Sequence, residues 1–273
     1  MGFLLVRSAR LPLGRARHPG GAPKAPWQAG RLTEIGSFIA GLVAWEILGR
    51  VLALPWLPPF SACVSALVDL INQGLIVTQL IDSVQALFIG FTAALVVSLV
   101  LAILMAEFPL VEQALSVYVY ALFMLPAIAL VPVFLAVFGI GNLTRLAVIF
   151  TYCFFFMTIN FQTAFTQREA AFIEMADSFQ ASRWQRLRFV VIPGAMPIMM
   201  ATVRVGLSRA VKGMINGEQF IALFGLGGLV ETFGGQFAAA KVFAVILVIV
   251  ALALVLDVIT RVLDTRWTRW AAP

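Results

Sequence analysis

Charged residues are scarce in this chain. They make up 12% of its 273 residues, whereas 62% of the residues are hydrophobic and the mean hydropathy is +0.99. A soluble globular domain carries about 25% charged residues, so the composition excludes an ordinary soluble protein and indicates a membrane protein. The net charge of +6 does not indicate nucleic-acid binding, because the basic residues cluster at the ends of apolar runs, as topology signals do.

Residues that bind metals or perform catalysis are also few. The chain has two cysteines, Cys63 and Cys153, and one histidine, His18, which excludes a disulfide scaffold and a His/Cys metal site. No Ser/His/Asp triad can form around a single histidine in a terminal tail. There is no Gly-Lys dipeptide, and therefore no Walker-type phosphate loop. The chain is predicted to be no enzyme and to bind no cofactor or metal itself.

Six apolar runs are each long enough to cross a bilayer, which takes about 20 residues. They predict an all-α membrane protein with about six transmembrane helices, and they lie near residues 34–54, 84–106, 114–138, 146–165, 196–224 and 240–263. Pro126 and Pro132 are predicted to kink the third span. Residues 55–74 are predicted to form a re-entrant or interfacial helix, and the glycine-rich residues 225–237 an external turn.

The positions of Lys and Arg predict the topology. The proline- and glycine-containing residues 1–32 hold six of them and are expected to be a disordered cytoplasmic tail. The loop between spans four and five holds four more, and the ends of span six and the tail 266–273 hold others. Basic loops stay in the cytoplasm, so both termini are predicted there, on either side of a permease-like domain at 33–265. The same topology places the acidic loop 107–112 in the cytoplasm, where a basic residue would be expected, and the loop has none.

Residues 174–193, EMADSFQASRWQRLRFVVIP, form the most polar stretch between two spans. Ser182 and Gln185 match the capping box S-x-x-Q, so two short helices are predicted to meet at Gln180-Ala181. Trp184, Leu187 and Val191 are predicted to share one face, and the prolines that follow to end the helix. Two interpretations are open: a loop lying on the membrane with arginines toward lipid phosphates, or a docking platform with an aromatic anchor.

This stretch resembles the EAA loop of binding-protein-dependent ABC importer permeases. The matching positions are Glu174, Ala176, Val190, Ile192 and Pro193, whereas Met175 replaces an alanine and Gln180 replaces a glycine. LPAIALVPVFLAVFGIGNLTRL (125–146), LPPFSACVSALVDL (57–70) and GLGGLV (225–230) are similar to segments of the nitrate/sulfonate/taurine branch of that family. Ala86 departs from the branch, which has an arginine there.

The resemblance implies a type I ABC importer permease-like fold in a bacterial inner membrane. It implies three partners: an ABC ATPase subunit that holds ATP and Mg, a second permease copy, and an extracytoplasmic solute-binding protein. The residues it implies for ATPase coupling are Glu174, Ala176, Gln180, Ser182, Trp184 and Pro193. Glycine permits the positive φ of the family's turn and Gln adopts it less readily, so a differently wound turn at Gln180 is a hypothesis. Docking is expected to survive, because the capping box and Trp184 remain.

Span five carries the charges expected to matter for transport. Arg209, Lys212 and Asn216 share a helix face by their spacing. With Glu218, they are predicted to line a translocation path that favours an anionic solute. The alternative is that these groups pair internally or reach the interface by snorkelling.

Two further features of the spans have open interpretations. The G-x-x-x-G at Gly213 and Gly217 permits close helix approach, either between two permease copies or within one. Glu46 and Arg50, four residues apart, are predicted to pair, and Asp257 has no obvious partner.

Two rival functions are weighed beside the importer subunit. A secondary transporter or channel would need ion-coupling acids in broken helices, often with an internal repeat, and no clear repeat is visible. A membrane anchor without transport would not need cations such as Arg209 and Lys212 inside a span.

Overall fold

The computed structural model describes residues 27–166, 174–176, 178–221 and 223–267. This part of the chain is helical and contains no β-strand, which confirms the all-α class. Most of the predicted N-terminal tail, residues 167–173, which include the start of the predicted coupling loop 169–193, and residues 268–273 lie outside it. The first helix begins at Trp27, inside the segment expected to be disordered. Contacts separate an N-terminal unit that ends at Trp45 from a unit that begins at Glu46, and every site discussed below lies in the latter.

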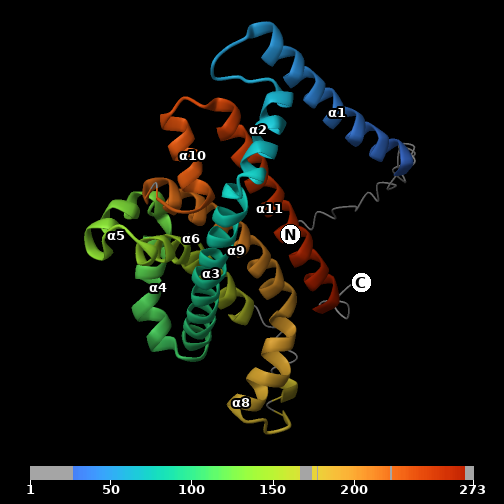
Figure 1. Ribbon diagram of the computed structural model, residues 1–273. Helices are drawn as coiled ribbons and strands as arrows, with labels where there is room; N and C mark the ends of the chain where they lie inside the picture. The colour runs from blue at the N-terminus through green and yellow to red at the C-terminus, as the bar shows by residue number, and fades with distance from the viewer. Residues whose placement is uncertain (1–26, 167–173, 177, 222, 268–273) are drawn as a thin grey trace, which may run out of the picture. The chain divides into compact units, whose positions relative to one another are not determined.

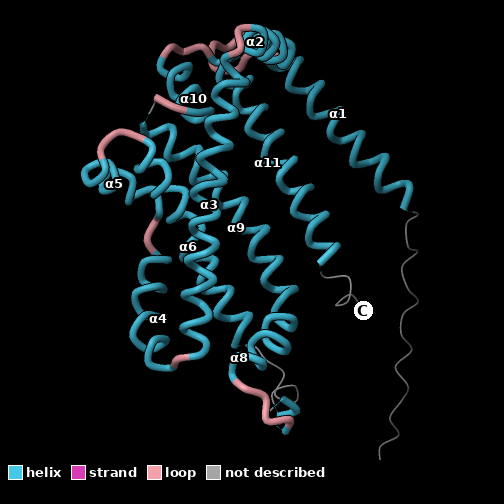
Figure 2. Tube along the Cα trace, turned by 60° about the horizontal axis from the view of Figure 1, so that its bottom comes forward, coloured by secondary structure: helices cyan, strands magenta, loops and turns pink. Residues whose placement is uncertain are grey.

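The helices follow the predicted spans closely (Figures 1 and 2). Their bounds are α1 Trp27–Leu52, α2 Phe60–Asn72, α3 Leu75–Glu107, α4 Pro109–Met124, η1 Ala127–Leu130, α5 Val131–Phe138, α6 Asn142–Thr166, α8 Arg183–Arg186, η2 Leu187–Val191, α9 Ile192–Ile221, α10 Gly225–Gly235 and α11 Ala239–Trp267. Within the described residues, five helices are long and apolar enough to cross a membrane, or six if the bent pair α4 and η1–α5 counts as one span.

The third predicted span is broken rather than gently kinked. The helices on either side of the break, 109–124 and 127–138, are bent by 97°. Leu125 is extended, as the residue before a proline tends to be, and Pro126 begins the 3₁₀ turn η1. Pro132 falls in the first turn of α5, where a missing N–H costs little. The sequence therefore predicted the place of the irregularity and underestimated its size.

The prolines at the start of span five do not end the helix, contrary to the prediction. α8 passes into the π-helix η2 and then into α9 without a break, and both Pro193 and Pro197 lie inside α9. A proline in a regular α-helix clashes with the carbonyl four residues earlier and leaves it without a donor. The wider π turn immediately before Pro193 relieves that crowding. The result is one continuous helical run from Arg183 to Ile221.

Helix α6 packs along both α9 and α3, and the seam between α6 and α9 includes two glycines. A Cβ added to Gly213 would lie 2.9 Å from Cβ of Tyr152, and one added to Gly217 would lie 3.3 Å from Cβ of Val148. Both glycines therefore face α6 of the same chain. The G-x-x-x-G serves packing within one copy, which decides between the two interpretations left open by the sequence.

This seam predicts that Gly213→Leu destabilises the bundle, because the new side chain must displace Tyr152 and the backbone at Ile149. Overpacking of this kind costs about 1–3 kcal/mol. Unfolding of the purified chain in mild detergent, followed by circular dichroism during SDS titration, measures the change. Gly194→Ala is the matched control in the same helix, because nothing lies within 4 Å of its added Cβ. Equal stability of the Gly213→Leu variant and the unaltered chain would contradict the seam.

Candidate functional site

The turn at Gln180 has the backbone conformation of a glycine turn. Gln180 has φ +55°, and the amide of Ala181 donates to the carbonyl of Ala176 at 3.0 Å. This bond, five residues back, together with the left-handed residue that precedes it, is the Schellman arrangement that ends helices. Gln180 therefore takes the positive φ that the family's glycine would take. The hypothesis of a differently wound turn is not supported.

A reciprocal capping box starts the next helix, as predicted. The Ser182 amide donates to Oε1 of Gln185 at 2.8 Å, and the Gln185 amide donates to Oγ of Ser182 at 3.3 Å. Two otherwise unpaired backbone donors are thereby satisfied. The capping box follows the Schellman turn directly. Residues 178–186 therefore pass from one helix end to the next helix start through hydrogen-bonded turns.

The loop carries an exposed apolar surface, which we define as Met175, Phe179, Trp184 and Phe189. Phe179, Trp184 and Phe189 are 79%, 65% and 69% exposed, whereas Leu187 and Val191 are buried. The predicted common face of Trp184, Leu187 and Val191 is therefore wrong. Trp184 lies in the single turn α8 at the end of the helical run, while Leu187 and Val191 lie in η2 and join the core.

The other implied coupling residues surround this surface. Glu174 is exposed, Ala176 is buried beneath the loop, and Pro193 is half-buried at the start of α9. Residues 167–173, which include the remainder of the first predicted helix, lie outside the described residues. The structure therefore brings Gln180, Ser182 and Trp184 together at one end of α9.

An ion pair joins this loop to the neighbouring helix hairpin. Nη2 of Arg186 lies 4.0 Å from Oε2 of Glu107 at the end of α3. Nearby, Gln162 of α6 donates to Glu112 at 2.9 Å. The acidic loop 107–112 therefore lies at the same end of the bundle as the basic loop. Its lack of positive charge, which fitted the predicted topology poorly, is offset by an arginine from the other loop.

On the predicted face of span five, the guanidinium of Arg209 lies close to two phenylalanine rings. The Arg209 guanidinium lies 4.3 Å from the ring centroid of Phe156 in α6 and 5.7 Å from that of Phe123 in α4. One turn away Lys212 is exposed, and two turns away Asn216 donates to the hydroxyl of Tyr152 at 2.5 Å. The face thus combines fixed donors with rings that hold the guanidinium by cation–π attraction.

Glu218 does not share this face, which corrects its place in the predicted path. It lies nine residues after Arg209, about two and a half turns, and so points to the opposite side of α9. Its side chain is fully buried, and its Oε2 accepts from the hydroxyl of Ser83 at 3.0 Å and from the amide of Gly227 at 2.9 Å. Glu218 is therefore a structural carboxylate within the protein.

Arg145 completes a buried charge cluster that sequence reasoning missed. Its guanidinium contacts both oxygens of Asp82 at 2.5 and 3.2 Å, Oδ1 of Asn142 at 2.6 Å and Oε1 of Glu218 at 3.5 Å. In the sequence, Arg145 stands directly before the predicted span 146–165 and indicates only a charge at the end of a span. The adjacent polar residues Asp82 and Ser83, shortly before the charge-free run 84–106, could have indicated a buried polar cluster.

The same cluster explains why residues 225–235 form the helix α10, where a glycine-rich turn was predicted. The first three amides of α10 donate to side chains: Gly225 to Gln79 at 2.6 Å, Leu226 to Ser83 at 2.8 Å, and Gly227 to Glu218. The unpaired donors of a helix N-terminus are thereby satisfied. A Cβ at Gly225 or Gly227 would collide with Glu218, so glycine is required here for close approach.

The other charges inside the spans are paired. Glu46 accepts from Arg50 at 2.5 Å, as predicted, and Asp257 lies 3.3 Å from Arg204 and 2.7 Å from Arg261. Among the described residues, neither Arg209 nor Lys212 has a carboxylate partner, and no group of three or more His, Cys, Asp or Glu side chains could hold a metal. The unpaired cations of the span interiors thus gather on one face of α9.

The structure combines a bundle of spanning helices, two cations on α9 without carboxylate partners among the described residues, and a capped turn before α8. This combination is typical of a membrane transport subunit. The family of binding-protein-dependent transport system inner membrane components matches residues 94–269. The riboflavin transport system permease protein RibX of Chloroflexus aurantiacus is 31% identical over 74% of this chain and 75% of its own length. The taurine transport system permease protein TauC of Escherichia coli is 27% identical over 87% and 89%.

A solved structure shows the same fold. A chain of the inward-facing MetNI methionine ABC transporter superposes with a TM-score of 0.65 at 17% identity, covering 72% of this chain and 98% of that chain. This chain therefore belongs to the binding-protein-dependent transport system inner membrane component family. It is a membrane-embedded permease subunit of an ABC importer, as the resemblance of its motifs implied.

The geometry of the turn predicts that Gln180→Gly strengthens it. A non-glycine residue in the left-handed region costs about 1–2 kcal/mol, and glycine removes that cost while the turn keeps its hydrogen bonds. Hydrogen exchange of the Ala181 amide, measured by mass spectrometry on the purified chain, should slow about fivefold. Ser178→Gly is the control, because Ser178 is helical and glycine there should speed exchange. Faster exchange in the Gln180→Gly variant would contradict the assigned backbone.

Proposed function

We propose that this chain forms the translocation path for a small anionic solute and couples it to a separate ATPase through residues 174–193. The observation that carries the path is the pair of unpaired cations, Arg209 and Lys212, in the middle of a span. Every other charged side chain within the span interiors of the described residues has an opposite charge beside it.

The depth of Arg209 argues against simple snorkelling toward the Ile221 end of α9. Arg209 lies 12 residues before Ile221 and 17 after Ile192, about 18 and 26 Å along the axis of α9. The end at Ile221 is beyond the reach of an arginine side chain, whereas Arg204 on the opposite side is five residues away, about 8 Å along the axis. A cation at mid-membrane costs about 2.5–3.5 kcal/mol on insertion scales unless it faces protein or water. A water-filled path that conducts anions gives both cations a suitable environment.

The aromatic contacts of Arg209 favour an oxyanion. Phe156 and Phe123 lie within cation–π distance of the guanidinium, and no carboxylate of the described residues pairs with its N–H edges. Those edges match carboxylate and sulfonate oxygens in a bidentate way. Lys212 adds a second, more mobile donor one turn away. The likeness to relatives does not select a solute by itself, because their names range from riboflavin to taurine.

The ATPase partner is supported by the exposed apolar surface of the loop. Its three exposed aromatic side chains lie on a capped, ordered turn at the end of α9. Exposed aromatic clusters on a fixed backbone are typical binding hot spots. A path that encloses solute also implies a second permease copy, and a binding protein would deliver solute at the opposite end. The basic loop and both termini then lie in the cytoplasm, with the chain in a bacterial inner membrane and ATP and Mg on the ATPase.

An ATP-independent secondary transporter is the second candidate. The broken third span is typical of such proteins. Its break at residues 125–131 holds no acid, however, and Asp82, Glu218 and Asp257 are all bound to arginines. No free carboxylate is left among these groups to couple an ion, so the importer subunit is favoured.

Arg209→Gln and Lys212→Gln are expected to lower uptake of an anionic solute at least tenfold, because each removes one cation from the path. Cells that express the chain with its neighbouring ATPase and binding protein are tested with radiolabelled taurine, nitrate and riboflavin. Lys241→Gln is the matched control, since Lys241 lies at a span end and stacks on Phe233. Unchanged anion uptake by both variants, at equal membrane abundance, would overturn the path.

Trp184→Ala is expected to weaken the complex with the ATPase about 30-fold, as removal of a central aromatic anchor costs about 2 kcal/mol. Co-purification from detergent-solubilised membranes, titrated with the ATPase, measures the affinity. Phe237→Ala is the control, because Phe237 is an even more exposed aromatic residue but follows α10 at the opposite end of the bundle. If Trp184→Ala lowers binding to anionic vesicles and leaves the ATPase complex intact, the loop is a membrane-surface element.

A further inference from the structure

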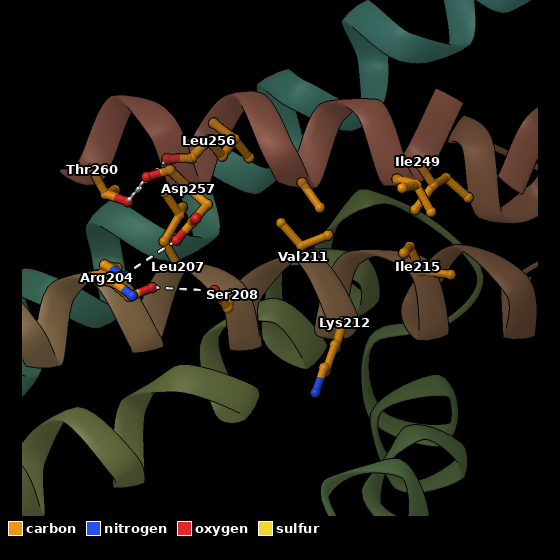
Figure 3. A pocket seen from close by; sticks show the side chains of 12 residues that line it. Arg204, Leu207, Ser208, Val211, Lys212, Ile215, Ile249, Leu256, Asp257 and Thr260 are labelled. Atoms are coloured by element: carbon orange, nitrogen blue, oxygen red, sulfur yellow. Dashed lines mark hydrogen bonds and ion pairs between the residues drawn. The ribbon is translucent and has the colours of Figure 1, made fainter. Parts of the chain in front are cut away.

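A groove between α9 and α11 divides into a charged end and an apolar end. It has a volume of about 270 Å³ and lies away from the packed seam with α6. Figure 3 shows Arg204, Asp257 and Thr260 at one end and Ile215 and Ile249 at the other. Lys212 borders the groove, but its side chain points away from α11. An amphipathic groove of this kind fits a ligand with one polar end.

The charged end lies at the same depth on both helices. Arg204 is 17 residues before Ile221 on α9, and Asp257 is 18 residues after Ala239 on α11, about 26 and 27 Å from those ends. The hydrocarbon core of a bilayer is about 30 Å thick. With Ile221 and Ala239 taken as one edge of that core, the charges lie at the opposite headgroup boundary, on the side of residues 174–193, and the apolar end lies within the core.

The charges at this end are unbalanced in favour of an anion. Nε of Arg204 lies 3.3 Å from Oδ1 of Asp257, and Nε of Arg261 lies 2.7 Å from Oδ2. Two guanidinium groups thus share one carboxylate, which leaves a net charge of about +1. The side chains of Arg204 and Arg261 remain 39% and 61% exposed. Arg204 lines the groove, Arg261 follows the lining residue Thr260 on α11, and both have further N–H groups besides the Nε that contacts Asp257.

We propose that this groove binds one anionic phospholipid. Its phosphate contacts Arg204 and Arg261, and one acyl chain lies along Val211, Ile215 and Val250. Basic pockets between spanning helices are suited to anionic headgroups, and the almost wholly apolar remainder of the lining does not suit a water-soluble solute. Lys212 of the proposed path borders the groove, but its side chain points away from α11 and Arg209 lies on another face of α9, so lipid binding does not depend on which solute is carried.

Native mass spectrometry of the full chain in mild detergent tests the proposal. Phosphatidylglycerol is titrated against phosphatidylcholine with the same acyl chains, and glycerol 3-phosphate serves as the soluble phosphate. Phosphatidylglycerol should bind in preference. Arg204→Gln and Arg261→Gln should each weaken it about fivefold, since one arginine near the surface contributes that much. Val250→Trp, which fills the apolar end without changing charge, should weaken it too.

Asp257→Asn distinguishes a lipid site from a purely structural ion cluster. The variant raises the charge of the mouth by one, so phosphatidylglycerol should bind about fivefold more tightly. A structural role predicts weaker binding, as for Arg204→Gln, because the cluster is disrupted either way. Arg50→Gln is the control, because Arg50 is an exposed arginine paired with an acid four residues earlier, as Arg261 is. It should leave lipid binding unchanged.

Three results would overturn the proposal. The first is equal binding of the two phospholipids, with no change in the Arg204→Gln and Arg261→Gln variants. The second is binding of glycerol 3-phosphate alone as tightly as the lipid, which would make the groove a soluble anion site. The third is a dimer that Val250→Trp dissociates, with no lipid bound, which would show that a second copy covers the groove. Unfolding curves of each variant confirm that it is folded.

Discussion

The buried carboxylate of Glu218 is the contact on which the end of the bundle opposite residues 174–193 depends. It joins α9 to Ser83 of α3, to Arg145 of α6 and to the first turn of α10. Five of the eleven residues of α10 are glycines, each about 1 kcal/mol worse in a helix than alanine. The helix therefore depends on side-chain caps from its neighbours. Removing one member of a buried pair costs about 3–5 kcal/mol, so the cluster fixes the arrangement of these four helices.

The division between paired and unpaired charges gives the bundle its functional asymmetry. Acids and arginines meet at both ends of the spans, where Asp82 holds Arg145 and Asp257 holds Arg204 and Arg261. A membrane protein tolerates charge in a span only when protein, ion or water compensates it. The middle of α9 has two cations that no carboxylate of the described residues compensates. This lack of carboxylate partners, rather than the number of charges, distinguishes the proposed path from the structural charge clusters.

The sequence predicted those parts of the fold that depend on local chemistry. Apolar runs located the spans, the spacing of Ser182 and Gln185 located a helix start, and Pro126 located a break, because each acts through the chain beside it. It did not predict α10, the π turn before Pro193 or the burial of Glu218. These depend on partners distant in sequence, such as Ser83 for Glu218. The exposed position of Trp184 was missed because a helix periodicity was carried through a π turn.

The continuous helix from α8 to α9 offers a route by which movement of the loop could reach the proposed path. Every residue from Arg183 to Ile221 is helical, so a displacement of Trp184 passes to Arg209 along about 38 Å of hydrogen-bonded backbone. The widest part of that run is the π turn η2, a feature often found where helices adjust. Beside it, the Arg186–Glu107 pair connects the loop to α3. A displacement of the loop would thus act on both α9 and α3. These two helices are also joined at their other ends, where Ser83 of α3 donates to Glu218 of α9. The helix that bears the cations and the helix that supports its far end would then move as one unit.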